Sequence, residues 1–371
     1  MRIAVGLSGG VDSSVAAAVL KASEHEVIGV TMKLWREGRY KGGSRDACFG
    51  PGEAEDIARA EALCRKLGIA YHVFDCADEY EAVVLDYFRK EYLNGRTPNP
   101  CVRCNAMMKF GVLPHLARKA GLHFDVFATG HYARIHTPEQ PPRPLGTPPQ
   151  EGKYQLWTGV EPQKDQSYFL YRLRQDQLAG LMFPVGHLRK AQVRDLARQF
   201  DLDVKDQPES QDFYSGDHTE LLKVSPRTGN IVDVRGTVLG THEGFWNFTV
   251  GQRRGLGIAT GEPLYVVELN ACRNEVVVGR EDAVRCHCFT VGDTHWIGME
   301  PPDAPLDVTV KVRSAAPAVE AQLMRMKNEE CKMKNDGLFS VTVPEGVYAP
   351  AKGQSAVFYH GERVLGGGII S

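Results

Sequence analysis

Apolar and polar positions in the first half of the chain follow two alternating patterns. Short apolar runs bounded by glycine or polar residues are typical of buried parallel strands, and longer stretches with apolar residues at helical spacing are typical of helices. Alternating strands and helices predict an α/β fold with a doubly wound parallel sheet, whose ligands bind at the carboxyl ends of the strands. The predicted elements are strands at 3–7, 26–32, 69–74 and 126–129, and helices at 11–20, 53–67 and 80–93.

The pattern changes after about Gln207, where short strand-like runs replace the strand–helix alternation. After about Gly279 these runs are separated by turns at a spacing that predicts a small C-terminal β-barrel. Because 371 residues are too many for one ordinary core, we expect three domains, at 1–206, 207–279 and 280–371. The strand-like runs lie at 229–238, 245–250, 264–269, 308–312, 318–323, 338–343, 354–359 and 363–370.

A glycine-rich turn joins the first predicted strand to the first predicted helix. Its two adjacent glycines allow positive φ angles and leave room for backbone N–H groups to converge on an anion. The start of the helix adds unpaired N–H donors and the positive end of its dipole. Asp12 is positioned either to hold Mg²⁺ or to cap the helix. The turn therefore predicts a phosphate site formed by Gly6, Leu7, Ser8, Gly9, Gly10, Val11, Asp12 and Ser13.

A second segment, 95–105, carries two prolines and two cysteines three residues apart. The prolines favour extended or turn conformations, with a helix starting near Pro100. Cys101 or Cys104 would then lie in the first turn of a helix, close to Arg103 and Lys109, where the dipole and the cations lower the pKa of a thiol. Such a pair also suits a structural zinc site, with Cys286 and Cys288 as further ligands, or two inert buried thiols.

Composition limits the class of protein but does not identify a function. With 43% hydrophobic and 24% charged residues the chain is ordinary for a globular protein, and its net charge of −2 gives no overall attraction to nucleic acid. No run approaches the ~20 apolar residues of a membrane span. Met1 leads directly into the first strand, so we expect no signal peptide and a cytoplasmic protein, whose nine cysteines do not form structural disulfides.

The string Ser8–Ser13 resembles the pyrophosphate loop of the N-type ATP pyrophosphatases, or adenine nucleotide alpha hydrolase-like proteins, which split ATP between its α and β phosphates and adenylate a substrate. It matches neither the P-loop nor the dinucleotide-binding pattern. Along nearly its whole length the chain resembles the bacterial tRNA-specific 2-thiouridylase family. The segments that carry this resemblance are 8–13, 31–35, 95–105, 109–111, 128–132, 164–170, 208–212 and 249–258.

The resemblance implies ATP-dependent transfer of sulfur to C2 of the wobble uridine in the tRNAs for Lys, Glu and Gln. In that reaction ATP, bound with Mg²⁺, adenylates the uridine, a cysteine persulfide charged by an upstream donor protein attacks, and AMP leaves. The glycine-rich turn would hold the ATP phosphates, and Cys104 would be the reactive thiol. Further implied roles are adenosine binding by Met32 and Gly130, contact with the target base by Asn99, Pro100 and Cys101, and contact with tRNA by Lys164, Asp165, Gln166 and Arg313.

The chain departs from that family at Tyr214, which stands where a second reactive cysteine is usual. Three interpretations remain open. Cys101 can take over as the persulfide partner of Cys104, the two thiols can hold an iron–sulfur cluster, or the protein can bind ATP and tRNA without catalysis. A further departure follows Arg313, where Ser314-Ala315-Ala316 replaces an aromatic and an amide. An ammonia-delivering ATP pyrophosphatase is the competing enzyme class, but it gives the two cysteines no role.

Overall fold

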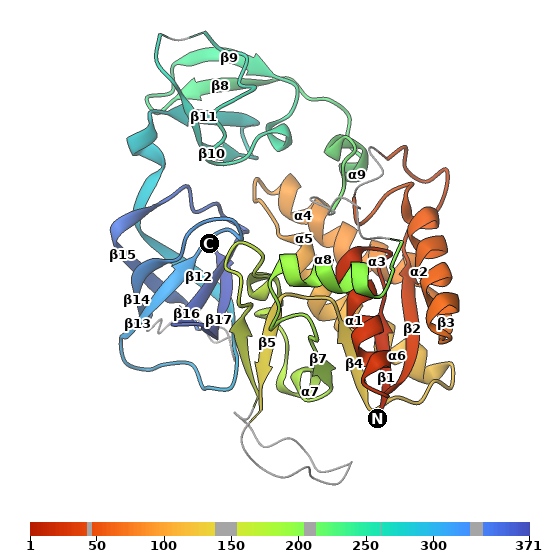
Figure 1. Ribbon diagram of the computed structural model, residues 1–371. Coiled ribbons are helices and arrows are strands. Elements are labelled where there is room, and N and C mark those ends of the chain that lie inside the picture. The colour runs from red at the N-terminus through yellow and green to blue at the C-terminus, as the bar shows by residue number, and fades with distance from the viewer. Residues whose placement is uncertain (43–46, 138–153, 204–212, 260, 327–336) are drawn as a thin grey trace.

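The computed structural model describes residues 1–42, 47–137, 154–203, 213–259, 261–326 and 337–371. The N-terminal part of these residues contains a five-stranded parallel sheet in the order β3-β2-β1-β4-β7 (Figure 1). The predicted parallel sheet is confirmed, and the predicted strands are found to within a residue or two. The strands are β1 (Arg2–Gly6), β2 (Glu26–Lys33), β3 (Ala70–Asp75), β4 (Val126–Thr129) and β7 (Leu181–Met182).

Helices cover both faces of this sheet, as a doubly wound fold requires. On one face Ile3 and Val5 of β1 pack in a core shared with α1 (Val11–Ala22), α2 (Glu53–Leu67) and α8 (Lys190–Gln199). On the other face Ala4 packs with Phe127 and with α6 (Leu113–Lys119). Alternate residues of β1 therefore enter opposite cores, which is why that strand is apolar throughout.

Two helical runs lie between β3 and β4. The first is continuous through α3 (Ala77–Tyr80), a π-helical stretch η1 (Glu81–Leu85) and α4 (Asp86–Leu93). The second starts at Pro100, as predicted, and runs through α5 (Pro100–Arg103) and the π-helical stretch η2 (Cys104–Val112) into α6. Asn99 caps α5, because its side chain accepts a hydrogen bond from the Val102 N–H at 3.2 Å. Shorter helices follow at η3 (Ser167–Leu170) and α7 (Gln175–Leu178).

The central region forms a four-stranded sheet in the order β10-β11-β8-β9, preceded by α9 (His218–Leu222). The predicted strand at 245–250 is wrong: residues Phe245–Asn247 form a 3-10 helix, η4. The chain turns there because Gly244 has φ +151°, and Phe245 and Trp246 point into the core instead of alternating. The strands are β8 (Gly229–Asp233), β9 (Val238–His242), β10 (Tyr265–Asn270) and β11 (Glu275–Gly279).

The C-terminal region is an antiparallel barrel in which β12 pairs with β17 and closes the sheet. The barrel is confirmed, but its longest strand, β12, was not among the predicted runs. A hairpin from the N-terminal half, β5 (Ala133–His136) and β6 (Gln155–Thr158), extends the barrel sheet by pairing with β17. The barrel elements are η5 (Glu281–Val284), β12 (Arg285–Trp296), β13 (Leu306–Lys311), β14 (Val319–Arg325), β15 (Phe339–Tyr348), β16 (Ser355–His360) and β17 (Arg363–Ile370).

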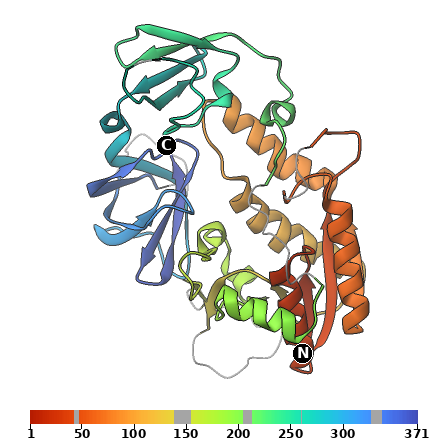
Figure 2. The same cartoon turned by 45° about the horizontal axis from the view of Figure 1, so that its top comes forward.

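The loop that precedes Cys101 lies where the three regions meet. The Thr97 N–H donates to the Lys352 carbonyl of the barrel at 2.7 Å. A Cβ on Gly95 would lie 2.9 Å from the Leu269 carbonyl of the central sheet. Figure 2 shows the helical runs between the parallel sheet and the two β regions. The cysteine segment, residues 95–105, is therefore held by contacts far away in the sequence.

Candidate functional site

The glycine-rich turn lies at the carboxyl edge of the sheet, where β1 ends between β2 and β4. Gly9 has φ +73°, and a Cβ there would lie 2.6 Å from the carbonyl oxygen of Asp56 in α2. Only glycine fits this position. Gly10 is the N-cap of α1 in an extended conformation with φ −93°, so Gly10 does not adopt the positive φ that its glycine type allows.

Serine hydroxyls hold the turn in shape. The Ser8 N–H donates to the Ser13 hydroxyl oxygen at 3.3 Å, and the Ser13 and Ser14 hydroxyls donate to the Gly10 carbonyl at 3.2 and 2.8 Å. These bonds close the turn onto the first residues of α1. The N–H groups of this 12-residue helix start there, which is the arrangement that binds phosphate in proteins.

Asp12 does not cap α1, so that alternative of the prediction is wrong. Its carboxylate accepts hydrogen bonds from the ammonium of Lys190 at 2.8 and 2.9 Å and from the Tyr132 hydroxyl at 2.6 Å. Lys190 is the first residue of α8 and is buried. Sequence analysis missed Lys190, because a single lysine at the start of a helix carries no local signal of a partner 178 residues away.

Residues after β4 pack directly against the start of α1. A Cβ on Gly130 would lie 2.5 Å from both the Asp12 carbonyl carbon and the Ser13 nitrogen. Tyr132 is oriented by Gln166, whose side chain accepts from the Tyr132 N–H at 3.0 Å and whose N–H donates to the Tyr132 carbonyl at 2.9 Å. Gly130 therefore allows the close approach that brings Tyr132 to Asp12.

His131 follows β4 and Met32 lies near the end of β2, and these two strands flank β1. Burial, with the nearby charge of Lys109, holds the pKa of His131 well below its ordinary value, and its Nδ1 bonds the Thr129 hydroxyl at 2.8 Å. His131 is therefore neutral at physiological pH. Met32 is half-buried near the end of β2. The turn after it is fixed by Glu53, which accepts from the N–H groups of Leu34 and Trp35 at 2.7 and 2.8 Å.

The thiol chemistry of the cysteine segment differs from the prediction. Cys101 and Cys104 are both half-buried on the helix. Burial raises the pKa of Cys104 to about 11, although the charge of Lys109 lowers it in part. Arg103 gives no such help, because its guanidinium donates to the Val83 carbonyl at 2.6 Å and lies over the Tyr87 ring. The expected lowering of this pKa is therefore wrong for Cys104 in the ligand-free protein.

The residues expected to contact tRNA have structural partners. The Asp165 carboxylate accepts from the N–H groups of Gly159 and Ser167, both at 3.0 Å. Arg313 donates to the Val250 carbonyl at 2.8 Å and so joins the barrel to the central region. Lys164 is half-buried in the turn before Asp165. Their roles in tRNA binding, like that of Pro100 at the start of α5, stay predictions.

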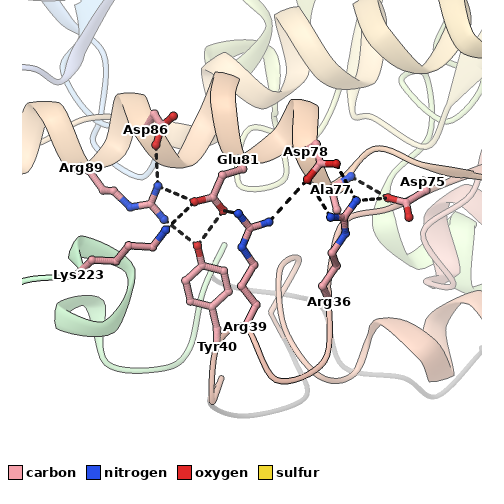
Figure 3. A network of polar contacts seen from close by, with 10 residues as sticks. All are labelled: Arg36, Arg39, Tyr40, Asp75, Ala77, Asp78, Glu81, Asp86, Arg89 and Lys223. Atoms are coloured by element: carbon pink, nitrogen blue, oxygen red, sulfur yellow. Dashed lines mark hydrogen bonds and ion pairs between the residues drawn. The ribbon is translucent and has the colours of Figure 1, made fainter.

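A network of charges ties the loop after β2 to the helical run and to α9 (Figure 3). Glu81 accepts from the Tyr40 hydroxyl at 2.8 Å, from Lys223 at 3.0 Å and from Arg89 at 2.8 Å. Burial raises the pKa of Glu81, but these three partners outweigh it and hold that pKa at about 2. The network therefore holds the loop before residue 42 and α9 against η1, which packs on α5 and η2 of the cysteine segment.

Comparison with known proteins decides the family. The chain is 42% identical to the tRNA-specific 2-thiouridylase MnmA of Endomicrobium trichonymphae, over 100% of this chain and 99% of that protein. The chain belongs to the tRNA-specific 2-thiouridylase family. The protein of the same name from Roseiflexus castenholzii is also 42% identical, over 100% of this chain and 99% of its own length.

Family models describe the same regions under other names. They match residues 1–214 as a tRNA methyl transferase HUP domain, 220–280 as a tRNA methyl transferase PRC-barrel domain and 286–370 as an aminomethyltransferase beta-barrel domain. A solved 4-thiouridine synthetase–RNA complex with bound ATP has a TM-score of 0.35 and 12% identity, over 60% of this chain and 45% of that one, too distant to carry an argument.

Tyr214, where the resemblance leads us to expect a second cysteine, lies in the core. Tyr214 is 3% exposed, its hydroxyl donates to Glu220, and its ring packs 6.1 Å from Phe49. Burial raises its pKa further above the ordinary range. Tyr214 is therefore a structural residue. The motif at 208–212 lies outside the described residues.

Neither a three-ligand metal site nor a membrane-spanning helix is found among the described residues. There, no three His, Cys, Asp or Glu side chains are arranged to hold a metal ion. Among the described residues, the cysteine pair is therefore not joined by Cys286, Cys288 or another third ligand. No helix in the part of the chain that the structure describes is long and apolar enough to cross a membrane.

Proposed function

We propose that this protein uses ATP to place sulfur on C2 of the wobble uridine of tRNAs for Lys, Glu and Gln, with the sulfur supplied by a persulfide-bearing donor protein in the cytoplasm. The observation that carries the proposal is the contact between η2, which begins at Cys104, and His131: the Phe110 ring of η2 lies 5.5 Å from the His131 ring. His131 follows β4 beside the glycine-rich turn, so one short helix connects the thiol with the predicted ATP site.

The ATP half of the reaction rests on the turn 6–13. Its N–H groups and the start of α1 would bind the phosphates, and Met32 and Gly130 would face the adenosine. Both carboxylate oxygens of Asp12 accept hydrogen bonds from Lys190, so Mg²⁺ would arrive with the nucleotide. Lys190 is placed to stabilise negative charge that develops on the phosphates once ATP competes for it.

The sulfur half rests on Cys104 and Cys101. C2 of uracil is a poor electrophile, and adenylation of its oxygen creates a leaving group. The terminal sulfur of a Cys104 persulfide attacks C2, the C2–O bond breaks and AMP leaves. The Cys101 thiolate then attacks the sulfur of Cys104, which forms a Cys101–Cys104 disulfide and releases 2-thiouridine. An external dithiol reductant restores both thiols.

Two other interpretations remain, and the chain favours neither. A non-catalytic relative would need no thiols beside the predicted ATP site, and the described residues do not supply the ligands of an iron–sulfur cluster. The family models name methyl transfer, whereas the relatives are named for thiolation. Two cysteines one helical turn apart suit sulfur transfer better than methyl transfer.

The test is formation of 2-thiouridine. Protein, ATP-Mg²⁺, unmodified tRNA and a persulfide donor should give 2-thiouridine by nucleoside mass spectrometry, and Cys104→Ser should abolish it while ATP is still consumed. Cys101→Ser should be equally damaging for repeated turnover. A wild-type protein that binds tRNA tightly but makes no 2-thiouridine with any donor would contradict the proposal. A fully active Cys101→Ser variant would remove Cys101 from it.

A further inference from the structure

Cys48 lies beside Tyr214, where the resemblance leads us to expect a thiol. The N–H of Phe49 donates to the carbonyl of Phe213 at 2.8 Å, so the chain at Cys48 runs next to the chain at Tyr214. The Phe49 ring also packs 6.1 Å from the Tyr214 ring. A thiol borne by the loop before α2 thus occupies the neighbourhood where the family's second cysteine would be expected.

The same loop reaches toward Cys104. The ring of Phe49 stacks on Tyr80 with centroids 5.0 Å apart, and α3, which ends at Tyr80, packs against η2, which begins at Cys104. Burial raises the pKa of the Tyr80 hydroxyl, and the neighbouring Cys104, Cys101 and Cys48 raise it further. The loop that carries Cys48 and the helix that carries Cys104 therefore both pack against α3, which ends at Tyr80.

The three thiols differ in access to solvent. Cys48 is exposed, whereas Cys101 and Cys104 are half-buried in the helix wall. A persulfide carried by another protein reaches an exposed thiol more readily than a half-buried one. We propose that Cys48 is the thiol that accepts sulfur from the donor protein and passes it to Cys104, an assignment that rests on the function proposed above.

Both transfers balance without a change in overall oxidation state. The Cys48 thiolate attacks the outer sulfur of the donor persulfide, the donor S–S bond breaks, and the donor leaves as a thiolate. The Cys104 thiolate then attacks the outer sulfur of the Cys48 persulfide, which leaves Cys48 as a thiolate and Cys104 as the persulfide. Two electrons are exchanged only later, when Cys101 and Cys104 form their disulfide.

The test compares two sulfur sources in single-turnover thiolation. One arm uses a cysteine desulfurase charged with cysteine. The other uses the oxidised protein with inorganic sulfide, which opens the Cys101–Cys104 disulfide to a persulfide and bypasses Cys48. Cys48→Ser should lose about 20-fold or more with the desulfurase and keep the wild-type rate with sulfide. Cys272→Ser, which removes another exposed thiol, should match the wild type in both arms.

Each other outcome has a defined meaning. Equal rates for Cys48→Ser and wild type with the desulfurase would overturn the role of Cys48, as would loss of both arms. A wild type inactive in both arms would instead contradict the proposed function. A second measurement does not depend on turnover: in Cys104→Ser charged with radiolabelled sulfur by the desulfurase, the label should stay on the Cys48 peptide. Label on the Cys101 peptide would overturn the assignment.

Discussion

The turn at 6–13 and the cysteine segment at 95–105 form the two halves of the candidate site, and they are built differently. The turn is held by its own serines and by residues of the same α/β region. The cysteine segment is held by the barrel through Lys352 and lies against the central sheet at Leu269. The phosphate half is therefore formed within one region, and the sulfur half depends on three.

This difference determines which structural changes should affect each half of the candidate site. Damage to the turn should act on ATP chemistry alone, because its contacts are local. Damage to the packing of the three regions should act on the sulfur half first, because the loop before Cys101 takes its position from them. Variants in each half should therefore have separable effects.

Asp12→Asn should have the largest effect. It leaves the buried Lys190 without a charged partner, so ATP consumption should fall by about 1,000-fold and the free energy of unfolding by about 3 kcal/mol. Pyrophosphate release, tRNA binding and denaturant unfolding check this, and tRNA should still bind. Asp195→Asn is the control, because Asp195 pairs with Arg198 on the exposed surface of α8, the helix that begins at Lys190. Unchanged ATP consumption would contradict the assignment of the glycine-rich turn as the phosphate site.

The reactivity of Cys104 should depend steeply on pH. Because its pKa is raised to about 11, only the small thiolate fraction reacts near neutrality. Alkylation of Cys104 should rise about tenfold per pH unit up to that pKa. Iodoacetamide labelling followed by peptide mass spectrometry measures this, and Cys272 serves as the exposed comparison. A plateau already at neutral pH would show an activated thiol and contradict the structure.

Gly130→Ala should damage the phosphate half through packing alone. Its Cβ would lie 2.5 Å from the backbone of Asp12 and Ser13, so the start of α1 must move. We expect a loss of about 2 kcal/mol in the free energy of unfolding, together with weaker ATP binding. Gly180→Ala should be near neutral, since its closest neighbour would be 3.8 Å away. Equal stability of the two variants would be inconsistent with the close approach.

Glu81→Gln tests whether the charge network around Glu81 stabilises the region that carries the cysteine segment. At neutral pH it should lower the free energy of unfolding by about 2 kcal/mol, because Lys223 loses its anion and Arg89 keeps only Asp86. The folded-state pKa of Glu81, about 2, lies below its ordinary 4.5. The wild type therefore gains this stability above about pH 4.5 and loses it as the pH falls toward about 2.

Denaturant unfolding at several pH values measures this dependence. The gap between wild type and Glu81→Gln should shrink steadily in acid. Glu26→Gln removes an exposed ion pair with Arg2 and should show no comparable gap. A gap that persists unchanged at low pH would mean that Glu81 acts through packing rather than through its charge.

Much of the α/β region could be predicted from local sequence, for reasons visible in particular residues. The helix 53–67 is found at its predicted bounds, because its acidic first turn and Gly68, in the left-handed conformation, mark its two ends. The strand β12 was missed because its sequence mixes polar and apolar residues, and a bulge between Cys286 and Cys288 breaks its alternation.

The candidate site was predictable in its motifs and not in its partners. Glycines and cysteines signal their positions by type and spacing. The partnership of Lys190 with Asp12, and the packing of the Cys48 loop and the Cys104 helix against α3, depend on the three-dimensional fold. For the same reason the lowered pKa expected of Cys104 was wrong, because local sequence shows the cations and not the burial that outweighs them.

The hairpin β5–β6 has a consequence for how separable the regions are. It belongs to the N-terminal half of the sequence, yet it pairs with β17 at the C-terminal end of the chain. A fragment cut after the α/β region would carry β6 with an unpaired edge, and such edges promote aggregation. The barrel is thus no detachable module, and exchange of modules between relatives would have to carry this hairpin and its strand together.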